Sequence, residues 1–181
     1  MDKTKLLRSV FSGGAVLAAI FIVYGMLLYV LEVNYFSIGF GILNFVIMAV
    51  IFASVMLVFG KKIRNTLFEG YMSYGQAFAY TLALGILGGV FIAIFNFFFY
   101  EFVDLSYLDN QASEFLYKME QRGLSEEQLQ DIREKVSKEL HGPSWKKSLK
   151  GLMNNSIIAV IFSLIISIFV KQNKAYEASE L

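Results

Sequence analysis

Side chains that could do chemistry are few in this sequence and lie apart from one another. It has one histidine, His141, and no cysteine, so a metal site of imidazole and thiolate ligands is not predicted. His141 stands beside a Gly-Pro break at the end of a helical segment, where the helix dipole accounts for it better than metal binding does. We therefore expect no catalytic residue, no metal and no cofactor, and we expect the protein not to be an enzyme.

Within the apolar runs of the chain, the polar residues are amides with a few serines and threonines. The amides are Asn44, Asn96, Asn154 and Asn155. Paths for ions or protons through lipid usually keep ionisable residues inside the spans, and these runs have none. A transporter or an oligomeric channel subunit, with a pore lined by Asn and Ser, is therefore the second choice for function.

Four apolar runs must position these side chains. The chain has 181 residues, of which 56% are hydrophobic, and this places it in the membrane class. Since about 20 helical residues cross a hydrocarbon core, we predict an all-α polytopic membrane protein with four spans, at about 9–31, 36–59, 76–100 and 151–170. The first run is too long for a cleavable signal peptide and is interpreted as a retained anchor. A net charge of +1 gives no reason to expect nucleic acid as a partner.

Small side chains recur at every fourth position in the third span. They are Ala77, Thr81, Gly85, Gly89 and Ala93. Such a stripe lets another backbone approach closely, which is the usual basis of helix packing in lipid, so we predict that this helix is the central contact of the bundle. The fourth span carries a similar stripe, Asn155, Ala159, Ser163 and Ser167, which could face the third directly.

Glycines of the first span predict close packing as well. Gly13, Gly14 and Gly25 are its glycines, and glycine is common in membrane helices for this reason. A substrate site is the alternative for them.

The segment from Phe68 to Phe78 is polar, aromatic and rich in glycine. Because the uncharged stretch from Gly70 to Tyr100 would form a helix of roughly 46 Å, longer than the hydrocarbon core, we expect a break between Gly70 and Gly75. Tyr71 and Tyr74 would then belong to an aromatic belt at the interface. A re-entrant or ligand-contacting element is the alternative.

This Gly-aromatic-x-Ser-aromatic-Gly-Gln-Ala-Phe start of the third span resembles the bacterial membrane family catalogued as domain of unknown function 4199. Chain length, span order and a helical insertion before the last span are similar too, so the resemblance covers essentially the whole chain. It implies a four-span architecture. It implies no activity and no catalytic residues.

A water-facing helical insertion is predicted at 103–147. Two amphipathic helices are expected within 107–140, separated by Gly123 and a Ser125–Gln128 capping box. Their apolar residues, Phe115, Leu116, Met119, Ile132 and Val136, would either close on one another or be offered to a partner. We treat these five as a candidate partner surface.

Orientation follows from basic residues. The first two spans have six on one side, Lys3, Lys5, Arg8, Lys61, Lys62 and Arg64, and none on the other. Over all loops the count ties at eight on each side, because the segment 101–150 also carries eight. We give weight to the first hairpin and place both termini in the cytoplasm of a bacterium, with the spans in its inner membrane and the insertion outside.

Missing chemistry, small-residue stripes and an amphipathic insertion together favour a structural, scaffold or accessory interaction protein. The expected partners are membrane lipids, a protein that binds the hairpin at 107–140, and a second copy of the chain. The sequence names neither a ligand nor a partner.

Overall fold

The computed structural model describes residues 2–33, 38–103, 107–140 and 143–173, and it is all-α. Four helices are long and apolar enough to cross a membrane, and two shorter helices lie between the third and the fourth, which confirms the predicted fold class. The elements are α1 (Lys3–Val30), α2 (Ile38–Leu67), α3 (Tyr74–Phe98), the π-helical turn η1 (Phe99–Val103), α4 (Tyr107–Gln121), α5 (Glu126–Leu140) and α6 (Ser144–Val170). His141 lies outside the described residues.

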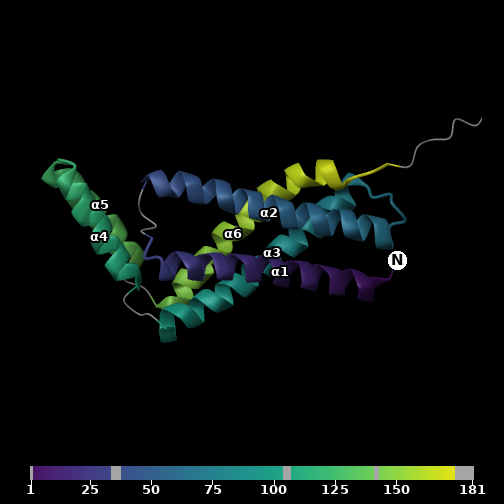
Figure 1. The fold of residues 1–181 in the computed structure, drawn as a ribbon, viewed down its shortest axis with the longest axis horizontal. Coiled ribbons are helices and arrows are strands. Elements are labelled where there is room, and N and C mark those ends of the chain that lie inside the picture. The colour runs from purple at the N-terminus through teal and green to yellow at the C-terminus, as the bar shows by residue number, and fades with distance from the viewer. Residues whose placement is uncertain (1, 34–37, 104–106, 141–142, 174–181) are drawn as a thin grey trace, which may run out of the picture.

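The four long helices form an elongated bundle, and α4 and α5 project from one end of it as an antiparallel pair (Figure 1). We call this the hairpin end. The opposite end carries the starts of α1 and α3 and the ends of α2 and α6, with Lys3, Lys5, Arg8, Lys61, Lys62 and Arg64, and we call it the basic end.

The long helices extend beyond the apolar runs that indicate them. Helix α1 begins at Lys3 rather than at residue 9, because the carboxylate of Asp2 caps it, accepting hydrogen bonds from the Thr4 and Lys5 amides at 3.0 and 3.2 Å. The backbone hydrogen bond from Lys5 lowers the pKa of Asp2. At the other side of the basic end, α2 continues past Gly60 to Leu67. Charged flanks form helix as readily as apolar residues do, so hydropathy alone sets these boundaries too short.

Between α2 and α3 the chain makes a turn, a β-bridge and a helix cap in succession. Glu69 and Gly70 take positive φ values of 53° and 86°, which ends α2. Met72 then exchanges two backbone hydrogen bonds with Gln172, both of 2.9 Å, and a Ser73–Gln76 capping box starts α3. The predicted break is therefore a connection at the basic end, and no re-entrant element forms within 68–78, all of which the structure describes.

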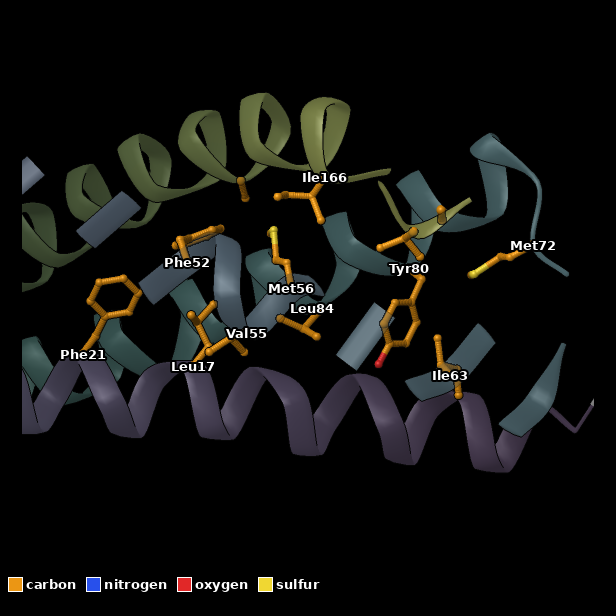
Figure 2. Packing of buried hydrophobic residues seen from close by; sticks show 13 residues of the cluster. Leu17, Phe21, Phe52, Val55, Met56, Ile63, Met72, Tyr80, Leu84 and Ile166 are labelled. Atoms are coloured by element: carbon orange, nitrogen blue, oxygen red, sulfur yellow. The ribbon is translucent and has the colours of Figure 1, made fainter. Parts of the chain in front are cut away.

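The hydrophobic core occupies the half of the bundle nearer the basic end. It runs between α1 and α6 from Phe21 to Met72 (Figure 2). Its buried members are Leu17, Phe21, Phe52, Val55, Met56, Ile63, Met72, Ala77, Tyr80, Leu84, Ala159, Ile166 and Val170. Among the described side chains of α2, those in or against this cluster begin at Ile51, so the other half of the bundle is filled differently.

Candidate functional site

The structure places the small stripes of α3 and α6 against each other in antiparallel order. The Thr81 and Ser167 hydroxyl oxygens are 3.4 Å apart, and a Cβ on Gly85 would lie 2.9 Å from the Cβ of Ala159. Farther along, a Cβ on Gly89 would lie 3.4 Å from that of Asn155. Ala77, Thr81, Gly85, Gly89, Ala159, Ser163 and Ser167 are buried, and Ala93 and Asn155 are half-buried. This seam holds the third and fourth spans together.

The glycines of α1 divide into two kinds. Gly13 and Gly14 lie against α3, where an added Cβ would come within 2.5 Å of Leu84 and 3.1 Å of the Gly88 amide nitrogen. At Gly25 an added Cβ would meet none of the described atoms within 4 Å. Close packing is thus the wrong interpretation for Gly25, because α1 and α3 touch where Gly14 meets Gly88 and enclose space farther along.

That space is a cavity of about 420 Å³ in the half of the bundle nearer the hairpin end. All four long helices, η1 and the first two turns of α4 contribute to its wall. The lining residues are Phe21, Gly25, Met26, Tyr29, Phe45, Met48, Ala49, Phe52, Gly89, Ile92, Phe95, Asn96, Phe99, Tyr100, Tyr107, Gln111, Asn155, Ile158 and Phe162. The volume falls within the range of small-molecule sites.

Aromatic rings close the cavity toward the core. The ring centroids of Phe21 and Phe52 are 6.0 Å apart, and those of Phe52 and Phe162 are 5.4 Å apart. Since Phe21 and Phe52 also belong to the core, these three rings form a floor between the packed half of the bundle and the cavity.

A second group of rings closes the cavity toward the hairpin end. Tyr29 lies 5.1 Å from Phe99 and 5.0 Å from Tyr107, and Phe99 and Tyr107 are 6.0 Å apart, between ring centroids. Phe99 belongs to the π-helical turn that follows α3, a local widening of the helix that is frequent at functional sites. Tyr107 begins α4, so the projecting hairpin is attached through the roof of the cavity.

The cavity opens sideways, between α2 and α6. Three of its lining residues are exposed there, Phe45 at 63%, Met48 at 37% and Ile158 at 36%. The two helices meet nearer the basic end, where Phe52 packs against Phe162 and Gly60 against Val170, and they part toward the hairpin end (Figure 1). In a membrane this opening faces the acyl chains of lipids.

Two amides of the intramembrane set, Asn96 and Asn155, lie in the cavity wall. Among the residues that the structure describes, neither side-chain amide has a hydrogen-bond partner. Asn44 differs, because its oxygen accepts a 2.8 Å hydrogen bond from Tyr24, and Asn154 is exposed outside the lining. No described lining residue carries a formal charge. The site can therefore hold and orient an uncharged molecule.

The projecting hairpin keeps most of its apolar surface to itself. Met119 is buried, and the other four residues of the candidate partner surface, Phe115, Leu116, Ile132 and Val136, are half-buried. An ion pair between Arg133 and Glu120 joins α5 to α4. On α5, the 2.7 Å contact with Asp131 raises the pKa of Lys135. The apolar stripes could close on one another or be offered to a partner. Because these five side chains are buried or half-buried, most of their surface is already covered.

Sequence reasoning missed the cavity, although it singled out Gly25, Asn96 and Asn155 separately. The available signal was that these three residues lie at a similar distance from the hairpin end. Aligning the helices by distance from the hairpin end groups them. A cavity, however, forms where side chains of neighbouring helices do not touch, and no local sequence pattern shows this.

One family model matches most of this chain. A family described as "Protein of unknown function (DUF4199)" matches residues 11–172, a range that begins in α1 and ends at the bridge to Met72. No curated protein and no solved structure matches the chain. Because the match covers well over half of the chain, the chain belongs to the DUF4199 family, whose function is unknown.

Proposed function

We propose that this membrane protein acts by association rather than by turnover, as an accessory protein that takes an apolar molecule from the bilayer into its lateral cavity. The observation that carries the proposal is the contrast within one bundle between a filled half and a half with a space of about 420 Å³ open toward lipid. Six aromatic rings in floor and roof, together with Met26 and Met48, suit an apolar ligand.

The same contrast argues against conduction through a single chain. From Phe21 to Met72 the core fills the bundle, and the Thr81 and Ser167 hydroxyls point into the α3–α6 seam. A small transporter or an oligomeric channel subunit remains the alternative function. Ion or solute flux through liposomes that contain the protein, unchanged when the cavity is filled by mutation, would favour that alternative.

Filling the cavity tests the proposal. Gly25→Leu places an isobutyl group into the space, whereas Gly41→Leu makes the same change on α2 at a glycine outside the cavity lining, where an added Cβ also meets none of the described atoms within 4 Å. Both variants should fold, and leucine favours helix over glycine by about 1 kcal/mol. Protein extracted in native membrane nanodiscs, transferred to detergent and analysed by mass spectrometry should retain an apolar molecule in wild type and in Gly41→Leu, but not in Gly25→Leu.

Equal retention of the same molecule by Gly25→Leu and wild type would overturn the proposal. So would the absence of any retained or added apolar molecule in wild type, because a preformed cavity of this size should keep part of its lipid contents through mild extraction.

A protein partner at the hairpin is a second candidate function. The observation that favours it is the projection of α4 and α5 from the bundle (Figure 1). Their exposed faces carry ion pairs, Lys118 with Glu114 and Lys135 with Asp131. Replacing 107–140 by a short flexible linker should leave the four spans folded and abolish recovery of a native protein partner by cross-linking. Recovery of the same partner with the linker variant would exclude this function for the hairpin.

We further propose that the protein lies in a bacterial cytoplasmic membrane with the basic end in the cytoplasm. The six basic residues of the first two spans support it, since positive charge is retained on the cytoplasmic side. Because the chain has no cysteine, Asn65→Cys and Ser125→Cys are clean labelling sites. An impermeant maleimide should label only Ser125→Cys in cells with a permeabilised outer membrane, and labelling of Asn65→Cys alone would reverse the orientation.

A further inference from the structure

We propose that the cavity is specific for a neutral lipid, namely a hydrocarbon chain whose head group carries uncharged oxygen. This inference rests on the proposed function and deepens it. It follows from three features of the lining: its lack of charge, the two asparagine amides Asn96 and Asn155, and the place where it opens.

Charge is the first feature. The described lining contains aromatic, aliphatic, methionine, glycine and amide residues and no Asp, Glu, Lys, Arg or His. A charged head group drawn into this space would lose its hydration without meeting an opposite charge, which costs several kcal/mol. A phospholipid or an ionised fatty acid is therefore disfavoured, and a neutral head group is not.

The amides are the second feature. Asn96 projects from α3 and Asn155 from α6, and among the described residues neither side chain has a hydrogen-bond partner. A polar group left dry in an apolar space costs about 1–3 kcal/mol. A hydroxyl, ester or carbonyl oxygen on the ligand would accept from either amide NH₂ group, so the ligand supplies the partners that the protein lacks.

The opening is the third feature. It lies between α2 and α6, at Phe45, Met48 and Ile158, on the side that faces acyl chains. A volume of 420 Å³ holds roughly 14 groups of the size of water or methylene. The head group and the first part of a chain therefore fit inside, while the remainder of a long chain leaves through the opening and stays in the bilayer.

Three ligands with the same chain separate these contributions. Dodecanol has a neutral oxygen, dodecanoate is charged at about pH 8, and dodecane has no head group. Their binding to the full-length protein in detergent micelles is measured by native mass spectrometry and by displacement of the lipid that the protein retains. We expect dodecanol to bind at least tenfold more tightly than dodecanoate and about fivefold more tightly than dodecane.

The amides are tested by Asn155→Leu and Asn96→Leu, with Asn154→Leu as the matched control. Asn154 is the neighbour of Asn155 on α6, but it is exposed and lies outside the lining. Each lining variant should remove most of the preference for dodecanol over dodecane, and Asn155→Gln should restore part of it. The Asn154→Leu variant should behave as wild type does. Two lining variants on different helices keep the test valid if one of them does not fold.

Failure of this inference differs from failure of the proposed function. If dodecanoate binds as tightly as dodecanol, or if Asn154→Leu changes the preference as much as Asn155→Leu, neutral-lipid specificity is wrong although the cavity still binds lipid. If Gly25→Leu leaves the binding of all three ligands unchanged, the cavity itself is not the site, and the proposed function fails with it.

Discussion

The two halves of the bundle differ in packing: one is filled with side chains and the other encloses a cavity. In the half nearer the basic end, small residues of α3 meet small residues of α6 and large side chains such as Leu17, Met56 and Leu84 fill what remains. In the half nearer the hairpin end, rings stand at the floor and roof and leave an open space between them. A membrane bundle thus needs close packing over only part of its length to hold its helices together.

The cause of the difference lies in side-chain size along α3. From Ala77 to Gly89 its seam residues are small, so the helix axes approach. From Phe95 to the end of α3 and into η1 as far as Tyr100, the residues are nearly all aromatic and hold the neighbouring helices apart. Lipid tails are as apolar as the side chains, so no hydrophobic force closes the gap.

The largest effect is expected from Gly85→Leu. A Cβ at Gly85 would lie 2.7 Å from the Met56 Cε and 2.9 Å from the Ala159 Cβ. The methionine end can move, but the alanine Cβ is fixed to its backbone, so α6 must shift and the cost should reach about 3 kcal/mol. The thermal unfolding midpoint in detergent should fall strongly. Gly89→Leu should be milder, because its nearest neighbours lie at 3.4 Å and the cavity can receive the side chain.

The exposed residue Ala83 gives the control for this pair, since Ala83→Leu adds bulk on a face of α3 that packs against nothing in the seam. Its midpoint should stay close to that of wild type. Equal midpoints for the Gly85 and Gly89 variants would contradict the difference in packing between the halves.

A medium effect is expected when one hydroxyl is removed from each half. Tyr80→Phe removes a 2.7 Å hydrogen bond to Ser9 within the core, and Tyr24→Phe removes the 2.8 Å hydrogen bond to Asn44 at the hairpin end. Each bond is worth about 1 kcal/mol. Tyr80→Phe should lower the thermal midpoint, whereas Tyr24→Phe should mainly speed hydrogen exchange in the first turns of α2. Similar exchange profiles for the two variants would mean that the halves respond as one unit.

The smallest effect is expected at Asp2. Asp2→Ala removes the cap of α1, and faster amide exchange should be confined to Thr4 and Lys5, with the core and the cavity unchanged. The sign of the pH dependence follows from the lowered pKa. The cap is fully formed above the ordinary value of 3.8 and is lost only as the pH falls through the lower folded value. A change near neutral pH in the protection factors of these two amides, which are their exchange rates corrected for the intrinsic pH dependence of exchange, would contradict this assignment.

Sequence alone predicts the elements of this fold well, because each depends on local properties. Uncharged length indicates the four spans, the capping signals near Ser125 mark the start of α5, and the glycine segment before Tyr74 marks the start of α3. The helix ends at Lys3 and Leu67 are missed, since hydropathy does not detect helix that leaves the membrane.

The site is harder to predict, because a cavity is a property of helix crossings. Gly14 and Gly25 are alike in sequence, yet one touches α3 and the other faces a void, depending on where α1 and α3 diverge. Asn44 and Asn96 also look alike in sequence. Asn44 accepts a hydrogen bond from Tyr24, whereas Asn96 has no such neighbour among the described residues and lines the cavity.

Contacts of α2 at the basic end fix one point about which a small rotation of the helix moves its far end. Gly60 rests on Val170, and the Arg64 guanidinium donates a 3.0 Å hydrogen bond to the Val170 carbonyl, so the fulcrum lies there. From Gly60 to Phe40 the helix is roughly 30 Å long, and a rotation of about 5° at the fulcrum displaces its far end by roughly 2.6 Å. Such a rotation would change the width of the lateral opening by more than the radius of a methylene group, and the Phe52–Phe162 ring contact and the Tyr24–Asn44 hydrogen bond are the contacts that oppose it.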